Sequence, residues 1–70
     1  MKYVLVAHFG INTAMQYPLH DTQEQAESAA RLTLQEFDGI SHIDVLSCDV
    51  DPITGAPLYN SLTPINIIWR

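Results

Sequence analysis

The sequence predicts a small α+β domain, in which an antiparallel sheet of three to four strands packs on one helix in the order β-β-α-β-β. Three observations lead to this prediction. Segments rich in β-branched and aromatic residues lie towards both ends of the chain. A central segment, TQEQAESAARLTLQEF, has helical spacing of its apolar residues. The length of 70 residues allows a single domain, spanning residues 1–70.

The N-terminal part is expected to form two strands, over residues 2–9 and 13–19. In the first, one face carries Tyr3, Leu5, Ala7 and Phe9, and the other carries Val4, Val6 and His8. A strand that is apolar on both faces is typical of a sheet centre covered on two sides. Pro18 cannot donate a hydrogen bond to a neighbouring strand, so the second strand belongs at an edge or ends there.

The helix is expected to begin at Asp21 or Thr22 and to end near Asp38. Each candidate first residue is followed three positions later by Glu or Gln, so either can form a capping box. Small and apolar residues then share one stripe: Ala26, Ala29, Ala30, Thr33, Leu34 and Phe37. Gly39 follows as the residue that ends the helix. The alanines on the stripe predict a helix that lies close to the sheet.

Two more strands are expected over residues 41–50 and 65–70. In the first, the alternation slips after Val45, which indicates either a β-bulge or a strand covered on both faces. In the last, Ile65, Ile67 and Trp69 share a face, with Ile68 opposite. Residues 51–63 are expected to form an ordered loop anchored by Ile53, Leu58, Tyr59 and Leu62.

One helix can cover only one face of this sheet, so the apolar residues of the second face need another cover. The sequence leaves two alternatives open. The loop over residues 51–63 can fold across that face, or a partner protein or second copy of the chain can cover it.

The charge excludes several classes of ligand. The formal net charge is −5, and the three bases Lys2, Arg31 and Arg70 are scattered, so neither nucleic acid nor an anionic membrane surface is expected as a direct ligand. A basic protein surface would be attracted. No apolar stretch approaches the roughly 20 residues that cross a bilayer, and the opening MKYVLVAHFG is interpreted as a strand. We therefore expect a cytoplasmic protein.

No motif predicts a reaction. Cys48 would need His8 or His20 beside it to act as a nucleophile, and a buried structural cysteine is the expected alternative. His42 and Asp44 share a strand face, but zinc needs three or four ligands and the sequence shows only this pair. We therefore expect no catalytic residue, no metal and no cofactor.

The order of a strand-rich start, a capped alanine-rich helix and further strands resembles that of small phage-encoded proteins, including anti-CRISPR proteins and host-takeover inhibitors. The resemblance covers most of the chain in layout and no specific motif, so it transfers no functional residue. It implies a binding inhibitor in the host cytoplasm, whose target is a nucleic-acid-handling complex.

The leading hypothesis is thus a non-enzymatic protein-binding module that blocks a surface of a bacterial host protein or defence complex. The expected partner-binding residues are Tyr3, Glu24, Glu27, Leu32, Glu36, Asp38, Asp44, Tyr59 and Trp69. One alternative is a self-associating structural or accessory subunit, such as a homodimer. The other is a small ligand-binding protein or enzyme that uses its histidines or its cysteine.

Overall fold

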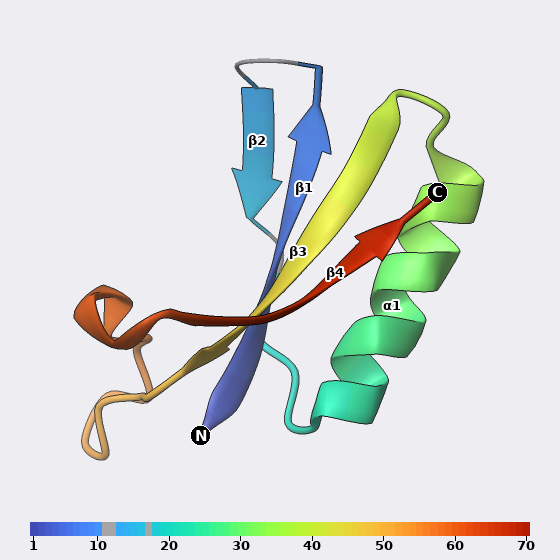
Figure 1. The fold of residues 1–70 in the computed structure, drawn as a ribbon. Coiled ribbons are helices and arrows are strands. Elements are labelled where there is room, and N and C mark those ends of the chain that lie inside the picture. Colours follow the sequence, from blue (N-terminus) through green and yellow to red (C-terminus); the bar gives the residue numbers. More distant parts are fainter. Residues whose placement is uncertain (11–12, 17) are drawn as a thin grey trace.

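The protein is a two-layer structure of one sheet and one helix (Figure 1). The computed structural model describes residues 1–10, 13–16 and 18–70. The elements are β1 (Lys2–Phe9), β2 (Thr13–Gln16), α1 (Gln23–Glu36), β3 (Ile40–Cys48), the short 3-10 helix η1 (Tyr59–Ser61) and β4 (Thr63–Trp69). The sheet order is β2-β1-β3-β4, and every neighbouring pair is antiparallel. The predicted α+β class, with a four-stranded antiparallel sheet on one helix, is confirmed.

The strand boundaries differ from the predicted ones mainly at the edges of the sheet. The second strand, expected over residues 13–19, ends at Gln16, and residue 17 lies outside the described residues. The last strand begins at Thr63, two residues before the predicted start at Ile65. β1 and β2 therefore form a short hairpin at one edge, and β4 forms the other edge.

The hydrophobic core lies between α1 and one face of the sheet. The strand register places Leu5 opposite Val45 and Ala7 opposite Ile43 on this face. The buried cluster consists of Leu5, Ala7, Ala26, Ala30, Leu34, Ile40, Ile43, Val45 and Ile68. Because an alanine side chain ends at Cβ, the fully buried Ala26 and Ala30 let the helix backbone lie close to the strands.

Thr22 is the N-cap of α1. Its hydroxyl accepts a hydrogen bond of 3.1 Å from the backbone N–H of Gln25, which satisfies one of the free amides of the first turn. Asp21, the other predicted candidate, instead forms an ion pair with Lys2. The hydrogen bond and the positive charge of Lys2 lower the pKa of the Asp21 carboxyl.

The predicted C-terminal end of the helix was wrong. The helix ends at Glu36, and Phe37 is the extended C-cap residue with a side chain that is 50% exposed. Gly39 does not adopt the positive φ of a left-handed cap. The guanidinium of Arg70 instead donates to the carbonyl oxygens of Phe37 and Ile40, and these bonds join the helix exit to the end of the chain.

The phase slip seen in the sequence corresponds to the two faces of β3. Ile43 and Val45 face the helix, whereas Leu46 and Cys48 lie on the opposite face, together with His42 and Asp44. The pairing of β3 with β1 is regular from His42 to Cys48. The irregularity beside Val45 and Leu46 lies in the pairing with β4, where Ile65 falls between two paired residues and has no partner of its own. The predicted bulge is therefore present in the pairing with β4, and cover on both faces is found only towards Cys48, at the end of the strand.

The loop between β3 and β4 is ordered by its own hydrogen bonds. The carboxylate of Asp51 accepts from the N–H of Ile53 at 2.8 Å, and the carbonyl of Asp51 accepts from the N–H of Gly55 at 2.8 Å. Ile53 is 92% exposed, so the prediction that it anchors the loop was wrong. The ring of Tyr59 is also largely exposed, but its hydroxyl accepts a hydrogen bond of 3.2 Å from the side-chain amide of Gln16 in β2. Figure 1 shows the first part of the loop extending beyond the end of β3. Its second part returns to the sheet, where the carbonyl oxygen of Leu58 accepts from Cys48 Sγ.

The free edge of β4 is partly blocked by its own residues. Pro64 has no amide hydrogen, and the N–H of Ile67 donates to the side-chain oxygen of Asn66 at 2.9 Å. The amide nitrogen of Asn66 also lies 3.4 Å from a carboxylate oxygen of Glu27 in α1. Among the described residues, α1 and η1 are both too short and too polar for a membrane-crossing helix.

Candidate functional site

The sheet face opposite α1 is uncovered over much of its area, and we call it the open face. It carries Val6 and His8 from β1, His42, Asp44 and Leu46 from β3, and Ile67 and Trp69 from β4. Trp69 is 66% exposed and Ile67 45% exposed. Towards the loop this face closes, because Val4 and Cys48 are fully or almost fully buried. The open face thus keeps the apolar side chains of Ile67 and Trp69 in contact with solvent.

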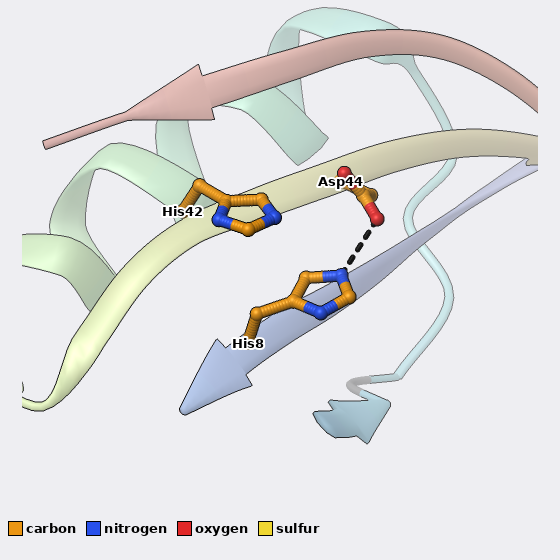
Figure 2. A group of neighbouring side chains, drawn as sticks. All are labelled: His8, His42 and Asp44. Carbon is orange, nitrogen blue, oxygen red and sulfur yellow. Dashed lines mark hydrogen bonds and ion pairs between the residues drawn. The ribbon is translucent and has the colours of Figure 1, made fainter. Parts of the chain in front are cut away.

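A polar cluster lies within the open face (Figure 2). His8 stands directly opposite His42 in the register of β1 and β3, and Asp44 follows on the same face of β3. His8 Nε2 and Asp44 Oδ2 are 2.7 Å apart, and each side chain is 30% exposed. The two imidazole rings stack with centroids 4.4 Å apart and an angle of 13° between their planes. Three titratable side chains from two strands therefore meet at one place.

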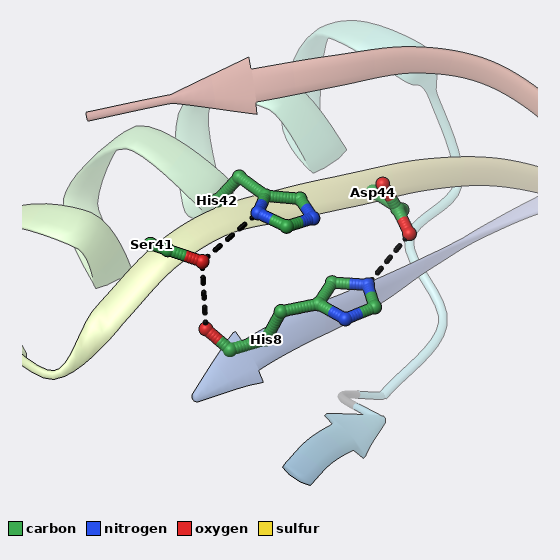
Figure 3. A network of polar contacts seen from close by, with 4 residues as sticks. All are labelled: His8, Ser41, His42 and Asp44. Atoms are coloured by element: carbon green, nitrogen blue, oxygen red, sulfur yellow. Dashed lines mark hydrogen bonds and ion pairs between the residues drawn. The ribbon is translucent and has the colours of Figure 1, made fainter. Parts of the chain in front are cut away.

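Ser41 determines which nitrogen of His42 carries the proton (Figure 3). The Ser41 hydroxyl donates to the carbonyl oxygen of His8 at 3.4 Å and lies 2.9 Å from His42 Nδ1. A hydroxyl has one proton, so when it donates to the carbonyl it must accept from Nδ1–H of His42. This tautomer leaves the lone pair of His42 Nε2 free, on the side of the ring that faces His8 and Asp44.

Trp69 extends the row of rings across a third strand. Its ring centroid lies 4.6 Å from that of His42, with an angle of 31° between the planes. The rings of His8, His42 and Trp69 therefore form a continuous row over β1, β3 and β4. A large aromatic surface with a polar edge, half open to water, is typical of residues that anchor protein interfaces.

The predicted partner-binding residues fall on different surfaces. Asp44 and Trp69 lie on the open face, and Tyr59 lies in η1. Tyr3 packs against the core on the helix side of the sheet. The others lie on α1 or just after it: Glu24, Glu27, Leu32, Glu36 and Asp38. The structure thus brings Asp44 and Trp69 onto one face and separates them from the acids of the helix.

The acids of α1 form a solvated helix surface. Glu27 accepts a hydrogen bond of 2.9 Å from Gln23, and Arg31 lies 3.7 Å from its carboxylate. The hydrogen bond from Gln23, and next the one from Asn66, lower the pKa of the Glu27 carboxyl. The carboxylate of Glu27 thus already has partners within the chain, and its position is explained without a bound ligand.

The cluster contains a residue that the sequence did not connect with the other two. His42 and Asp44 were recognised as a pair on one strand face, whereas His8 is 36 residues away from Asp44 in the chain. Only the register between β1 and β3 joins them. Cys48, by contrast, is buried, and its Sγ donates to the carbonyl oxygens of Asp49 and Leu58. The cysteine–histidine pair is not formed among the described residues.

In comparisons with known proteins, no family model matches this chain, and no curated protein or solved structure is significantly similar to it. What the chain binds is therefore inferred from its own surfaces.

Proposed function

We propose that the protein is a non-enzymatic protein-binding module that docks its open face on a partner and inhibits that partner by covering a functional surface. The exposure of the open face supports this most strongly. Trp69 and Ile67 are 66% and 45% exposed, whereas Leu5, Ile43 and Val45 on the helix side of the same sheet are almost completely buried. Burial of apolar surface contributes about 25 cal/mol per Å². A partner would cover the apolar side chains of the open face, as α1 covers those of the opposite face.

The charge of the chain favours a partner with a basic surface over a second copy. The formal net charge is −5, and Glu24, Glu36 and Asp38 are exposed on the helix side. A basic protein would be attracted over distances of about a Debye length, which raises the rate of association. Two copies of this chain would repel each other instead. The proposed occupant is therefore a different protein, which carries a net positive charge and offers an apolar contact area to the open face.

Basic surfaces of this kind are typical of proteins that bind nucleic acids. An acidic module seated on such a surface would exclude the nucleic acid both by its volume and by its charge. This mode of action agrees with the layout resemblance to phage inhibitors. The proposed target is accordingly a nucleic-acid-binding protein of the bacterial cytoplasm.

A pair of matched substitutions tests the docking surface. Ile67→Ser removes an exposed aliphatic side chain from the open face, and Leu32→Ser removes one from the helix surface, where Leu32 is 56% exposed. Proteins captured from a bacterial lysate by the wild type are identified, and the affinity of the purified basic partner is then measured for each variant. We expect Ile67→Ser and Trp69→Ala to weaken binding by about tenfold or more and Leu32→Ser to leave it unchanged.

Two results would contradict the proposal. The first is a partner that binds Ile67→Ser and Trp69→Ala as tightly as the wild type. The second is a wild-type chain that sediments as a stable dimer and becomes monomeric with Ile67→Ser, because the open face would then be occupied by a second copy. Far-ultraviolet circular dichroism of each variant establishes that a change in binding does not come from unfolding.

A further inference from the structure

We propose that His8, His42 and Asp44 form a binding site for a divalent transition-metal ion of the Zn²⁺ type. One nitrogen from each imidazole and one carboxylate oxygen all lie within 4.8 Å of one another. Imidazole nitrogen and carboxylate oxygen are both zinc ligands, and two histidines with one carboxylate form a ligand set of zinc sites that keep a position open. The site lies within the open face, but its three ligand residues are different from Ile67 and Trp69, at which docking is tested, so the two proposals can fail independently.

The strands hold the three residues in the positions that such a site requires. His8 and His42 are a cross-strand pair, so their Cβ atoms are held roughly 5 Å apart. Asp44 is on the same face of β3, one full strand repeat further along. The three side chains therefore stand at the corners of a triangle on two adjacent strands, and both strands have paired neighbours on each side.

Closing the triangle on an ion requires only side-chain movement. Ligand atoms around a tetrahedral zinc ion, with bonds of about 2.0–2.1 Å, are about 3.4 Å apart. The widest separation of 4.8 Å must therefore shorten by about 1.4 Å. The ring of His8 is part of a side chain that is 30% exposed, so rotation about its side-chain bonds can supply this movement while the strands stay in place.

The hydrogen bonds around the cluster prepare its ligand atoms. When Ser41 donates to the carbonyl oxygen of His8, it accepts from Nδ1–H of His42, and Nε2 of His42 is then the free ligand atom. A metal-binding histidine commonly has an oxygen partner for its other nitrogen, because this partner fixes the tautomer and the ring orientation. His8 Nε2–H donates to Asp44 Oδ2 at 2.7 Å, and an ion would take the place of this proton on Nε2 as the proton moves to Nδ1 of the same ring.

No basic side chain of the described residues competes for Asp44. Lys2 pairs with Asp21, Arg31 lies beside Glu27, and Arg70 donates to backbone carbonyls. Trp69 covers one side of the His42 ring and limits its rotation. Because the open face has no cover at this point, a water molecule can reach the remaining position on the ion.

The test uses the untagged full chain with Zn²⁺ and with Co²⁺ as a spectroscopic probe. Isothermal titration calorimetry is expected to show one bound Zn²⁺ per chain, and the unfolding midpoint is expected to rise with the Zn²⁺ concentration. His42→Ala and the isosteric Asp44→Asn are each expected to weaken binding by at least about tenfold, and Ser41→Ala by about tenfold. His20→Ala is the matched control, because His20 lies outside the cluster, and its affinity should equal that of the wild type.

The proposal is overturned if the wild type binds no Zn²⁺, or if His42→Ala and Asp44→Asn bind it as tightly as His20→Ala does. Two different ligand variants are used so that a folding defect in one leaves the other informative. Failure here would not affect the docking proposal, because that proposal is tested at Ile67 and Trp69, which contribute no ligand.

Discussion

At the scale of single residues, the alanines of α1 determine how closely the helix can lie on the sheet. Ala26 and Ala30 are both 0% exposed and face the strands. Any larger side chain at these positions would have to displace the helix or occupy a strained rotamer. Leu34, one turn further on, is the large side chain of the same stripe. The core is thus narrow at one end of the helix and filled by a large residue at the other.

Substitution of Ala30 by leucine is expected to destabilise the protein by about 1–3 kcal/mol, because the added atoms have no free volume between helix and sheet. The matched control is Ser28→Leu, which adds an aliphatic side chain on the exposed surface of the same helix and is expected to change stability by less than about 0.5 kcal/mol. Urea denaturation followed by circular dichroism measures both. Equal stability of Ala30→Leu and the wild type would show that the helix does not lie as close to the sheet as described.

At the scale of elements, the helix and the strands are held by interactions of different range. The N-cap of α1 involves residues three positions apart, Thr22 and Gln25. The exit of α1 depends on Arg70, which is 33 residues away from Phe37. The open face depends on the register of three strands. The helix therefore has one end fixed locally and the other fixed by the end of the chain.

Replacement of Thr22 by alanine is expected to cost about 1 kcal/mol of stability, because the N–H of Gln25 loses its acceptor. Asp21→Asn is the comparison, since it removes only the exposed ion pair with Lys2 and should have a smaller effect. Thermal unfolding of both variants at neutral pH checks this order. A larger loss with Asp21→Asn would mean that the ion pair with Lys2 stabilises this end of the helix more than the Thr22 cap does, because asparagine caps a helix as well as aspartate.

The difference between local and long-range interactions explains what could be predicted from the sequence. Strand alternation correctly separated the two faces of β1, and the capping pattern included Thr22. Gly39 was misassigned because the helix exit is completed by a guanidinium from the other end of the chain. Ile53 was expected to anchor the loop because it is apolar. The turn is instead held by the hydrogen bond between the Asp51 carboxylate and the N–H of Ile53, and the side chain of Ile53 stays in water.

The candidate site shows the same limit. Local alternation placed His42 and Asp44 on one face of a strand, and it placed Ile67 with Trp69. The position of His8 opposite His42 follows from strand register, which no short segment of sequence contains. The pairing of β1 with β3 is what brings His8 next to His42 and Asp44.

At the scale of the whole molecule, the protein is flat and slightly extended. Its extents are 38 × 25 × 18 Å, and its Cα radius of gyration is 12.0 Å, compared with about 11 Å for a typical compact domain of this length. The protruding loop and the single helix layer account for the difference. A molecule of this shape exposes a large part of its sheet, and net charge is what opposes association through it.

Lowering the pH towards the isoelectric point, which is near 4.7, is expected to promote self-association. Carboxylates are protonated as the pH falls, and those of Asp21 and Glu27, with their lowered pKa values, are among the last to lose their charge. Ile67→Ser should reduce this association, and Leu32→Ser should reduce it less. Light scattering between pH 7 and the isoelectric point measures the effect. If Ile67→Ser and the wild type scatter equally, the open face is not the surface involved.

The blocked edge of β4 has a consequence for the kind of assembly that this protein can enter. A contact made along the hydrogen-bonding direction of a sheet leaves a new free edge, so it can repeat without limit and produce fibres. The edge of β4 offers few free hydrogen-bond donors to a further strand. Pro64 has no amide hydrogen, and the amide of Ile67 is already bonded to the side chain of Asn66. When two flat sheet faces bind each other, both are covered, and no new free surface of the same kind is left for a further subunit. Complexes of this protein are therefore expected to have a fixed, small number of subunits, and electron microscopy of concentrated samples should reveal particles of uniform size in place of filaments.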